Sequence, residues 1–217
     1  MKYNTFIFDF DYTLADATDG IVKSMNYALQ KLGFEKRERE AIRKTVGMAL
    51  VDAFALLSGC QDEEKTRQFL AEYRVMADQV MTKKTVFFND TIDILKKLKE
   101  NHFKIGIASS KPRFRIEDVF IKLSYMDLVD YIVGIEDVRN PKPNPDGLLF
   151  AMDKLGAKKE QVLYVGDSII DAKTAQNAQI DFGGVTTGTT KENELLEFPC
   201  VAIGENLKDL FSKVGLV

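Results

Sequence analysis

The sequence predicts an α/β fold: a Rossmann-like, three-layer core with a parallel sheet, interrupted by an inserted all-helical cap domain. Three observations support this prediction. Short apolar runs alternate with helical patterns along most of the chain. One stretch of about 70 residues near the N-terminus has helical periodicity and no strand-like run. The length of 217 residues exceeds that of one typical domain of about 150 residues.

The strand-like runs are short, apolar and rich in β-branched and aromatic residues. Such runs are typical of strands that are buried on both faces of a parallel sheet. The first of them ends directly at a polar Asp-Phe-Asp segment. The expected strands are residues 3–8, 103–108, 131–135, 161–165, 180–185 and 201–203.

Helical patterns separate the later strands, because apolar residues recur there every three or four positions. A helix between two strands makes a βαβ unit, and repeated βαβ units build a parallel sheet. The expected helices are residues 91–99, 113–123, 145–155, 169–178 and 207–214.

The inserted helical domain is expected at residues 15–84. Ile21 and Leu29 lie on one helical face near its start, and glycines separate the segments that follow. The α/β core then comprises residues 1–14 and 85–217. Further helical patterns cover residues 41–45, 49–57 and 63–81.

Composition and charge exclude several classes of protein. The chain has 30 basic and 33 acidic residues and a net charge of −3, which argues against a nucleic-acid binder with a basic surface. His102 is the single histidine, so a multi-histidine metal site is excluded within one chain. Cys60 and Cys200 match no metal-binding spacing and fit a reducing compartment. No 18-residue apolar run predicts a membrane span, so a soluble, cytoplasmic protein is expected.

Polar residues follow four of the predicted strands. In an open parallel sheet, ligands bind at the carboxyl ends of the strands, so these residues should lie close together. The segments contain Asp9, Phe10 and Asp11 after the first strand, Ser109 and Ser110 after the second, Lys142 after the third, and Asp167 and Asp171 after the fourth.

These residue types suit phosphoryl transfer. The carboxylates of Asp9, Asp11 and Asp167 are hard oxygen donors of the kind that binds Mg²⁺, and they would repel one another without a cation. Ser109 and Lys142 offer a hydroxyl group and a point positive charge for phosphate oxygens. An aspartate can act as the nucleophile in such a reaction, so no histidine is needed.

In its motifs the chain resembles the haloacid dehalogenase superfamily. The residues that carry the resemblance are Asp9-x-Asp11-x-Thr13, Ser109, Lys142 in Lys-Pro-x-Pro, and Gly166-Asp167-(x)₃-Asp171. They occur in the family's order and cover essentially the whole chain. The helical insert looks like the small C1-type cap of that superfamily, and the length and cap position look most like phosphoglycolate-phosphatase-type members.

The resemblance implies a role for each carboxylate. Asp9 would be the nucleophile that accepts the phosphoryl group. Asp11 would protonate the leaving oxygen and then activate water. The backbone carbonyl of Asp11 and the carboxylates of Asp9 and Asp167 would bind Mg²⁺. Asp171 would reach the metal directly or through water, but Ser168 and Asp171 also form a capping-box pattern, so both interpretations stay open.

The resemblance also implies how the substrate is held. Ser109 and Lys142 would bind the phosphoryl oxygens, helped by backbone N–H groups near Phe10 and Asp11. Within the cap, Arg43 and Gly47 belong to a segment that is a candidate for substrate selection.

One residue distinguishes between branches of the superfamily, and two positions depart from the family pattern. Asp11 favours phosphate-ester hydrolysis, because dehalogenase-like members lack an aspartate there. Tyr12 stands where glycine is common, and Ser109-Ser110 replaces the commoner Thr-Asn. The last departure leaves the contribution of Ser110 to substrate binding open.

Together these features predict a Mg²⁺-dependent phosphatase that hydrolyses a small soluble phosphate monoester, phosphoglycolate-like or a sugar phosphate, through an aspartyl-phosphate. A sugar phosphomutase or a pyrophosphatase of the same superfamily is the alternative. A non-catalytic, phosphate-responsive regulatory module is a more distant one, against which Asp11 and the large insert argue. The physiological substrate and the oligomeric state are not determined by the sequence.

Overall fold

A six-stranded parallel sheet forms the centre of the α/β unit in the computed structural model, which describes residues 2–216. The strand order is β5-β4-β1-β6-β7-β8, with β1 in the middle, and Phe8 pairs with Ile107 on one side and Val165 on the other. This sheet confirms the predicted fold class. The strands are β1 (Thr5–Phe8), β4 (Lys104–Ala108), β5 (Tyr131–Val133), β6 (Val162–Gly166), β7 (Asp181–Val185) and β8 (Ala202–Gly204).

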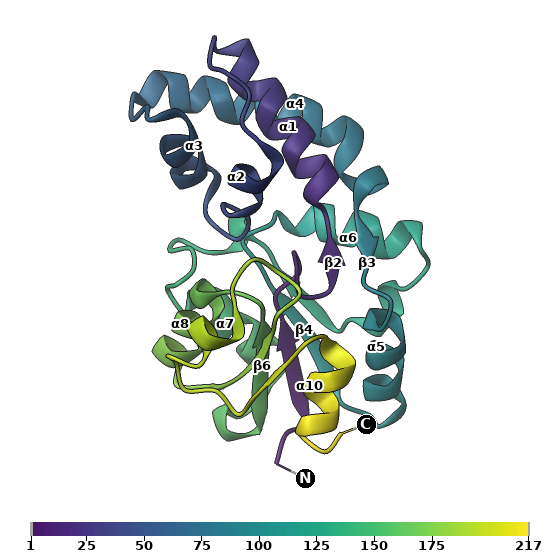
Figure 1. Ribbon diagram of the computed structural model, residues 1–217. Coiled ribbons are helices and arrows are strands. Elements are labelled where there is room, and N and C mark those ends of the chain that lie inside the picture. Colours follow the sequence, from purple (N-terminus) through teal and green to yellow (C-terminus); the bar gives the residue numbers. More distant parts are fainter. Residues whose placement is uncertain (1, 217) are drawn as a thin grey trace. The chain divides into compact units, whose positions relative to one another are not determined.

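Helices cover both faces of this sheet (Figure 1). Alternate residues of β1 explain why: Phe6 and Phe8 belong to the core on one face, and Ile7 belongs to the core on the other. The first face is covered by α5 (Thr91–Glu100), α6 (Arg113–Lys122) and α10 (Leu207–Lys213), and the second by α7 (Asp146–Lys154), α8 (Ile169–Ala178) and the short α9 (Glu192–Leu195).

Residues 17–86 form a separate compact unit that is almost entirely helical. Its core is apolar and aromatic: the rings of Phe54 and Phe69 stack with their centroids 4.4 Å apart, and Met25 is buried in the same cluster. The unit contains α1 (Thr18–Lys31), α2 (Arg39–Arg43), α3 (Leu50–Ser58) and α4 (Glu63–Lys84).

The remaining elements are short, and the sequence analysis missed them. Strands β2 (Ala15–Asp16) and β3 (Val86–Phe87) form a two-stranded sheet, and three 3₁₀ turns cover Met126–Leu128, Ile135–Asp137 and Lys159–Gln161. Segments of two to four residues, α9 included, are too short to show periodicity. In residues 2–216, no helix is long and apolar enough to cross a membrane.

The order of the strands decides where a ligand can bind. The chain passes from β1 to β4 on one side of β1 and later returns to β6 on the other side. A crevice opens at such a switch point, outside the carboxyl ends of the strands. The segments that follow β1, β4 and β6 therefore meet at one edge of the sheet.

Candidate active site

The segment after β1 turns tightly and carries two of the predicted carboxylates. The N–H of Asp9 still donates to the carbonyl of Val165 (2.8 Å), and the carbonyl of Phe10 accepts from the N–H of Leu14 (2.9 Å). Tyr12 has φ +62°, a left-handed conformation that glycine adopts without strain. This backbone geometry explains why glycine is common at this position, although here the tyrosine side chain is buried.

Lys142 joins two carboxylates at the centre of the site. Its ammonium group donates to Oδ1 of Asp9 (2.9 Å) and to Oδ1 of Asp171 (2.8 Å). Burial would lower the pKa of Lys142, but the charges of Asp171 and Asp9 outweigh that effect and raise it. Lys142 therefore carries its positive charge at neutral pH.

The carboxylate of Asp171 accepts four hydrogen bonds. Besides Lys142, its Oδ1 accepts from the hydroxyl of Tyr164 (2.9 Å), and its Oδ2 accepts from the hydroxyl (2.5 Å) and N–H (3.2 Å) of Ser168. The N–H of Asp171 donates to the Ser168 hydroxyl (3.2 Å), which completes the predicted capping box of α8. Asp171 thus positions Lys142, and both of its oxygens are already engaged.

The carboxylate of Asp11 pairs with a second lysine, Lys111. The ammonium of Lys111 donates to both of its carboxylate oxygens (2.8 and 2.9 Å), and the lysine side chain is only 5% exposed. Lys111 also lies over the ring of Phe10, 5.5 Å from its centroid. Sequence reasoning assigned no role to Lys111, although its place two residues after Ser109, at the end of a predicted strand, was a usable signal.

Asp167 lies against two neighbouring segments. Its Oδ1 accepts from the hydroxyl of Thr13 (3.2 Å), and a β-carbon built on Gly188 would lie 1.9 Å from its Oδ2. The hydroxyl of Thr187 donates to the carbonyl of Tyr12. The segment after β7 therefore lies close against Asp167, and a side chain at position 188 would require the Asp167 carboxylate to move.

The carboxylates of Asp9, Asp167 and Asp171 form an acidic cluster that outnumbers its single lysine, Lys142. Carboxylate oxygens of Asp9, Asp167 and Asp171 lie within 4.8 Å of one another, and Lys142 bonds to two of these three groups. Burial raises the pKa of Asp9 to about 6, with Lys142 opposing that rise, and burial also raises the pKa of Asp167 well above its usual range.

A divalent cation fits this arrangement. When all three carboxylates are ionised, one ammonium leaves two negative charges uncompensated. Asp9 and Asp167 offer hard oxygen ligands of the kind that Mg²⁺ prefers, whereas the oxygens of Asp171 are already occupied by other donors. Three acidic residues without histidine or cysteine do not suit zinc.

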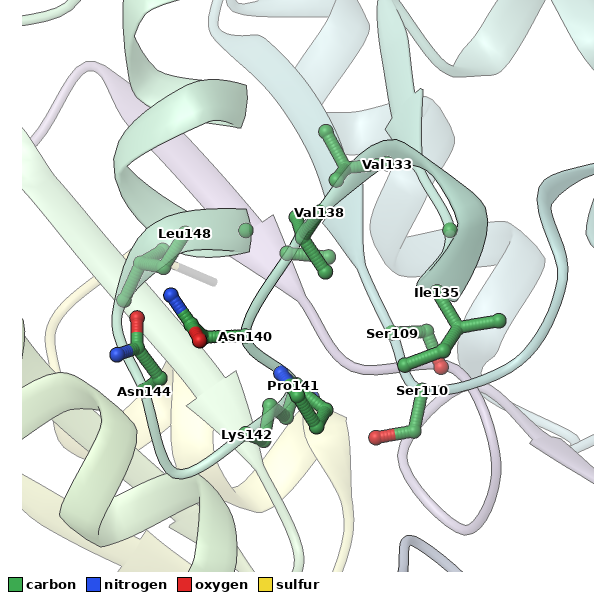
Figure 2. Close-up of a pocket in the computed structure, with 13 residues that line it drawn as sticks. Ser109, Ser110, Val133, Ile135, Val138, Asn140, Pro141, Lys142, Asn144 and Leu148 are labelled. Carbon is green, nitrogen blue, oxygen red and sulfur yellow. The ribbon is translucent and has the colours of Figure 1, made fainter. Parts of the chain in front are cut away.

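Ser109 and Ser110 lie opposite Lys142 across a small cavity (Figure 2). The cavity has a volume of about 20 Å³, which is room for about one water molecule. The hydroxyl of Ser109 hydrogen-bonds to Asp9 and accepts from the N–H of Lys111 (3.3 Å). Ser109 thus links the segments that follow β1 and β4.

The other predicted residues are placed as follows. The Phe10 side chain is fully buried in the core, so only its backbone is available to a ligand. Arg43 and Gly47 belong to the helical unit, where Arg43 pairs with Glu40 (3.0 Å) and Gly47 has φ +91°. Their part in substrate selection stays a prediction.

Comparison with known proteins identifies the family. A family model described as haloacid dehalogenase-like hydrolase matches residues 6–185. A pyrophosphatase PpaX from Bacillus cereus (strain AH820) is 32% identical over 179 residues, which cover 82% of this chain and 81% of the relative.

Two solved structures are similar over nearly their full length. A protein from Bacteroides fragilis, assigned to the haloacid dehalogenase-like hydrolases, is 41% identical with a TM-score of 0.92, and the match covers 95% of this chain and 98% of that one. A candidate phosphoglycolate phosphatase from Lactobacillus plantarum is 24% identical with a TM-score of 0.85, over 98% of this chain and 100% of that one. At 24% identity, the similarity to the Lactobacillus plantarum structure supports the fold alone.

Proposed function

The chain belongs to the haloacid dehalogenase-like hydrolases, and we propose that this phosphatase hydrolyses small phosphate monoesters with the help of Mg²⁺. One observation carries the proposal. The buried carboxylate of Asp9 lies at the end of the central strand in contact with the Lys142 ammonium, and a second carboxylate, Asp11, follows two residues later. A nucleophile, an anion-binding cation and an acid are the groups that phosphate-ester hydrolysis needs.

In the first half of the proposed reaction, the phosphoryl group moves to the protein. Lys142 and the Ser109 hydroxyl hold its oxygens, and the Asp9 carboxylate attacks phosphorus opposite the ester oxygen. A new bond forms between the Asp9 oxygen and phosphorus as the bond to the leaving oxygen breaks. Asp11, after taking up a proton from solvent as the substrate binds, donates it to that oxygen, so the alcohol departs neutral.

In the second half, water releases the phosphoryl group. Asp11, now ionised, accepts a proton from a water molecule that attacks phosphorus, and the bond to the Asp9 oxygen breaks. Inorganic phosphate leaves and both carboxyl groups return to their starting states. We propose that Lys111 keeps the Asp11 carboxylate in place when no substrate is bound, since it contacts both oxygens.

Mg²⁺ would be held by the carboxylates of Asp9 and Asp167 and by the backbone carbonyl of Asp11. When bound, it neutralises charge on the phosphoryl group. Asp171 is proposed to hold Lys142 and not the metal, because its oxygens already accept four hydrogen bonds. Within the inserted helical domain, proposed at residues 15–84, Arg43 and Gly47 are the candidates for substrate selection.

Mg²⁺ is expected to stabilise the fold more at neutral than at acidic pH. Because the pKa of Asp9 is raised to about 6, this carboxyl is mostly protonated near pH 5 and must lose its proton to bind a cation. Without metal, its favourable contribution to folding is present below the unfolded-state pKa near 4 and is lost as the pH rises through about 6.

Thermal unfolding measures this effect. About 10 mM MgCl₂ should raise the Tm by about 4 °C or more near pH 7.5, and by much less near pH 5. Asp167→Asn should remove the response, whereas Asp153→Asn, an exposed aspartate of the same unit, should keep it. An equal rise at both pH values, or an equal rise with KCl of matched ionic strength, would contradict the assignment of the metal site.

A phosphate-release screen tests the proposed function. Wild-type protein should release inorganic phosphate from p-nitrophenyl phosphate and from several small monoesters, and EDTA should abolish the release. The PpaX relative makes pyrophosphate hydrolysis the second candidate, so inorganic pyrophosphate belongs in the same panel. Turnover of pyrophosphate alone would favour that candidate. Absence of metal-dependent release from every compound would refute both.

A further inference from the structure

A second, separate cavity lies within the helical unit. It is an open groove of about 500 Å³ formed by α1, by Lys36 in the segment before α2, by Arg39 at the start of α2, and by α4. Helices α1 and α4, which pack together, are labelled in Figure 1. The groove is lined by Asp19, Val22, Lys23, Asn26, Tyr27, Gln30, Lys36, Arg39, Met76 and Lys84. None of these residues belongs to the α/β unit, so the groove is distinct from the candidate active site.

The groove concentrates positive charge in a chain whose net charge is −3. Four of its lining residues are basic and only Asp19 is acidic. Asp19 pairs with Arg39 (2.5 Å) and lies 3.8 Å from the ammonium of Lys84. Lys23 and Lys36 make no ion pair in the part of the chain that the structure describes, so their charges remain available to a ligand.

Hydrogen bonds hold one wall of the groove in place before any ligand binds. The amide of Asn26 on α1 donates to the carbonyl of Arg37 (3.0 Å) and accepts from its N–H (2.8 Å). The guanidinium of Arg37 donates to the carbonyl of Leu57 (2.6 Å). Lys36, next to Arg37, and Arg39, two residues after it, are therefore carried on a fixed backbone, which lowers the entropy lost on binding.

We propose that this groove binds a small anion that carries two or more phosphoryl groups. Its volume lies within the range of about 300–1,000 Å³ that is usual for small-molecule sites. With Asp19 counted against one cation, three positive charges remain, more than a single phosphate dianion neutralises. Lysine ammonium groups and an arginine fork are the side chains that bind phosphate oxygens.

The experiment titrates the full-length protein with inorganic tripolyphosphate. It uses ¹⁵N-labelled Asp9→Asn protein, without metal and at about 0.15 M KCl, where weak surface attraction is screened. Amide shifts at residues 19–39 and 76–84 should move and saturate. The double variant Lys23→Glu/Lys36→Glu in that background should weaken the binding by about tenfold or more, since two attractive charges become repulsive.

A matched control distinguishes binding within the groove from nonspecific attraction of the anion to positive charge. Lys65→Glu/Lys83→Glu changes the charge equally, at two exposed lysines of the same unit that do not line the groove. Its affinity for tripolyphosphate should change by less than about twofold. In the otherwise wild-type protein, the groove variant should leave phosphatase activity unchanged.

Three results would overturn the proposal. One is the absence of saturable shifts in the helical unit. Another is an equal loss of affinity in the two double variants, which would indicate long-range attraction only. The third is equal binding of inorganic phosphate, which would exclude selection for a multivalent anion. Because binding is read from amide shifts, the outcome does not depend on whether the protein proves to be a phosphatase.

Discussion

Asp9→Asn is expected to lower kcat by about 10³-fold or more while the protein stays folded. The asparagine amide is a poor nucleophile, so no bond to phosphorus forms. The change also removes one negative charge from a buried cluster in which burial already raises the pKa of Asp9 to about 6. Near pH 7.5, where that charge is costly, the metal-free variant should therefore unfold at the wild-type temperature or above it.

Steady-state hydrolysis of p-nitrophenyl phosphate with Mg²⁺, together with thermal unfolding, measures both parts of this prediction. Asp153→Asn is the matched control, because it makes the same chemical change at an exposed aspartate of the same unit. Near-wild-type turnover in Asp9→Asn would refute its assignment as nucleophile. Lost activity with lost folding would point to a structural role for the residue.

Lys142→Met is expected to affect both stability and catalysis. The oxygens of Asp9 and Asp171 would lose their cation inside the protein, which typically costs about 3–5 kcal/mol. Because Lys142 opposes the rise in the pKa of Asp9, that pKa should climb further in the variant. The phosphoryl oxygens would also lose a positive charge, so kcat/KM should fall by about 10²-fold or more.

The pH dependence identifies the cause. Because the pKa values of Asp9 and Asp167 are raised, these two carboxyl groups take up protons near pH 5, so the variant should lose less stability there than near pH 7.5. Urea unfolding at both pH values measures the difference, and Lys158→Met, at an exposed lysine of the α/β unit, serves as the control. An equal loss of stability at both pH values would argue for lost packing instead of unpaired charge.

Much of the architecture could be predicted because its signals are local. The apolar run before Asp9 and the periodicity of residues 169–178 lie close to the observed β1 and α8. The helix expected from residue 145 is observed as Asp146–Lys154, and the Asn144 side chain accepts from the Asp146 N–H (3.0 Å) at its start, as an N-cap does.

The residues of the candidate site could be predicted from the sequence. Asp9, Ser109, Lys142 and Asp167 follow different predicted strands, and a parallel sheet brings the carboxyl ends of its strands to one edge. The partners of these residues were not predictable. Lys111 meets Asp11 across 100 positions of sequence only because β4 pairs in register with β1.

The sequence by itself determined the α/β class, the helical insert and the acidic, lysine-containing chemistry of the strand ends, since these depend on periodicity and residue type. The tertiary structure alone decided how the charges are shared. In the folded protein the ammonium of Lys142 donates to Asp9 and Asp171, and the ammonium of Lys111 donates to Asp11. The reason is physical: burial and distance set the strength of charge interactions, and both arise only when distant segments fold together.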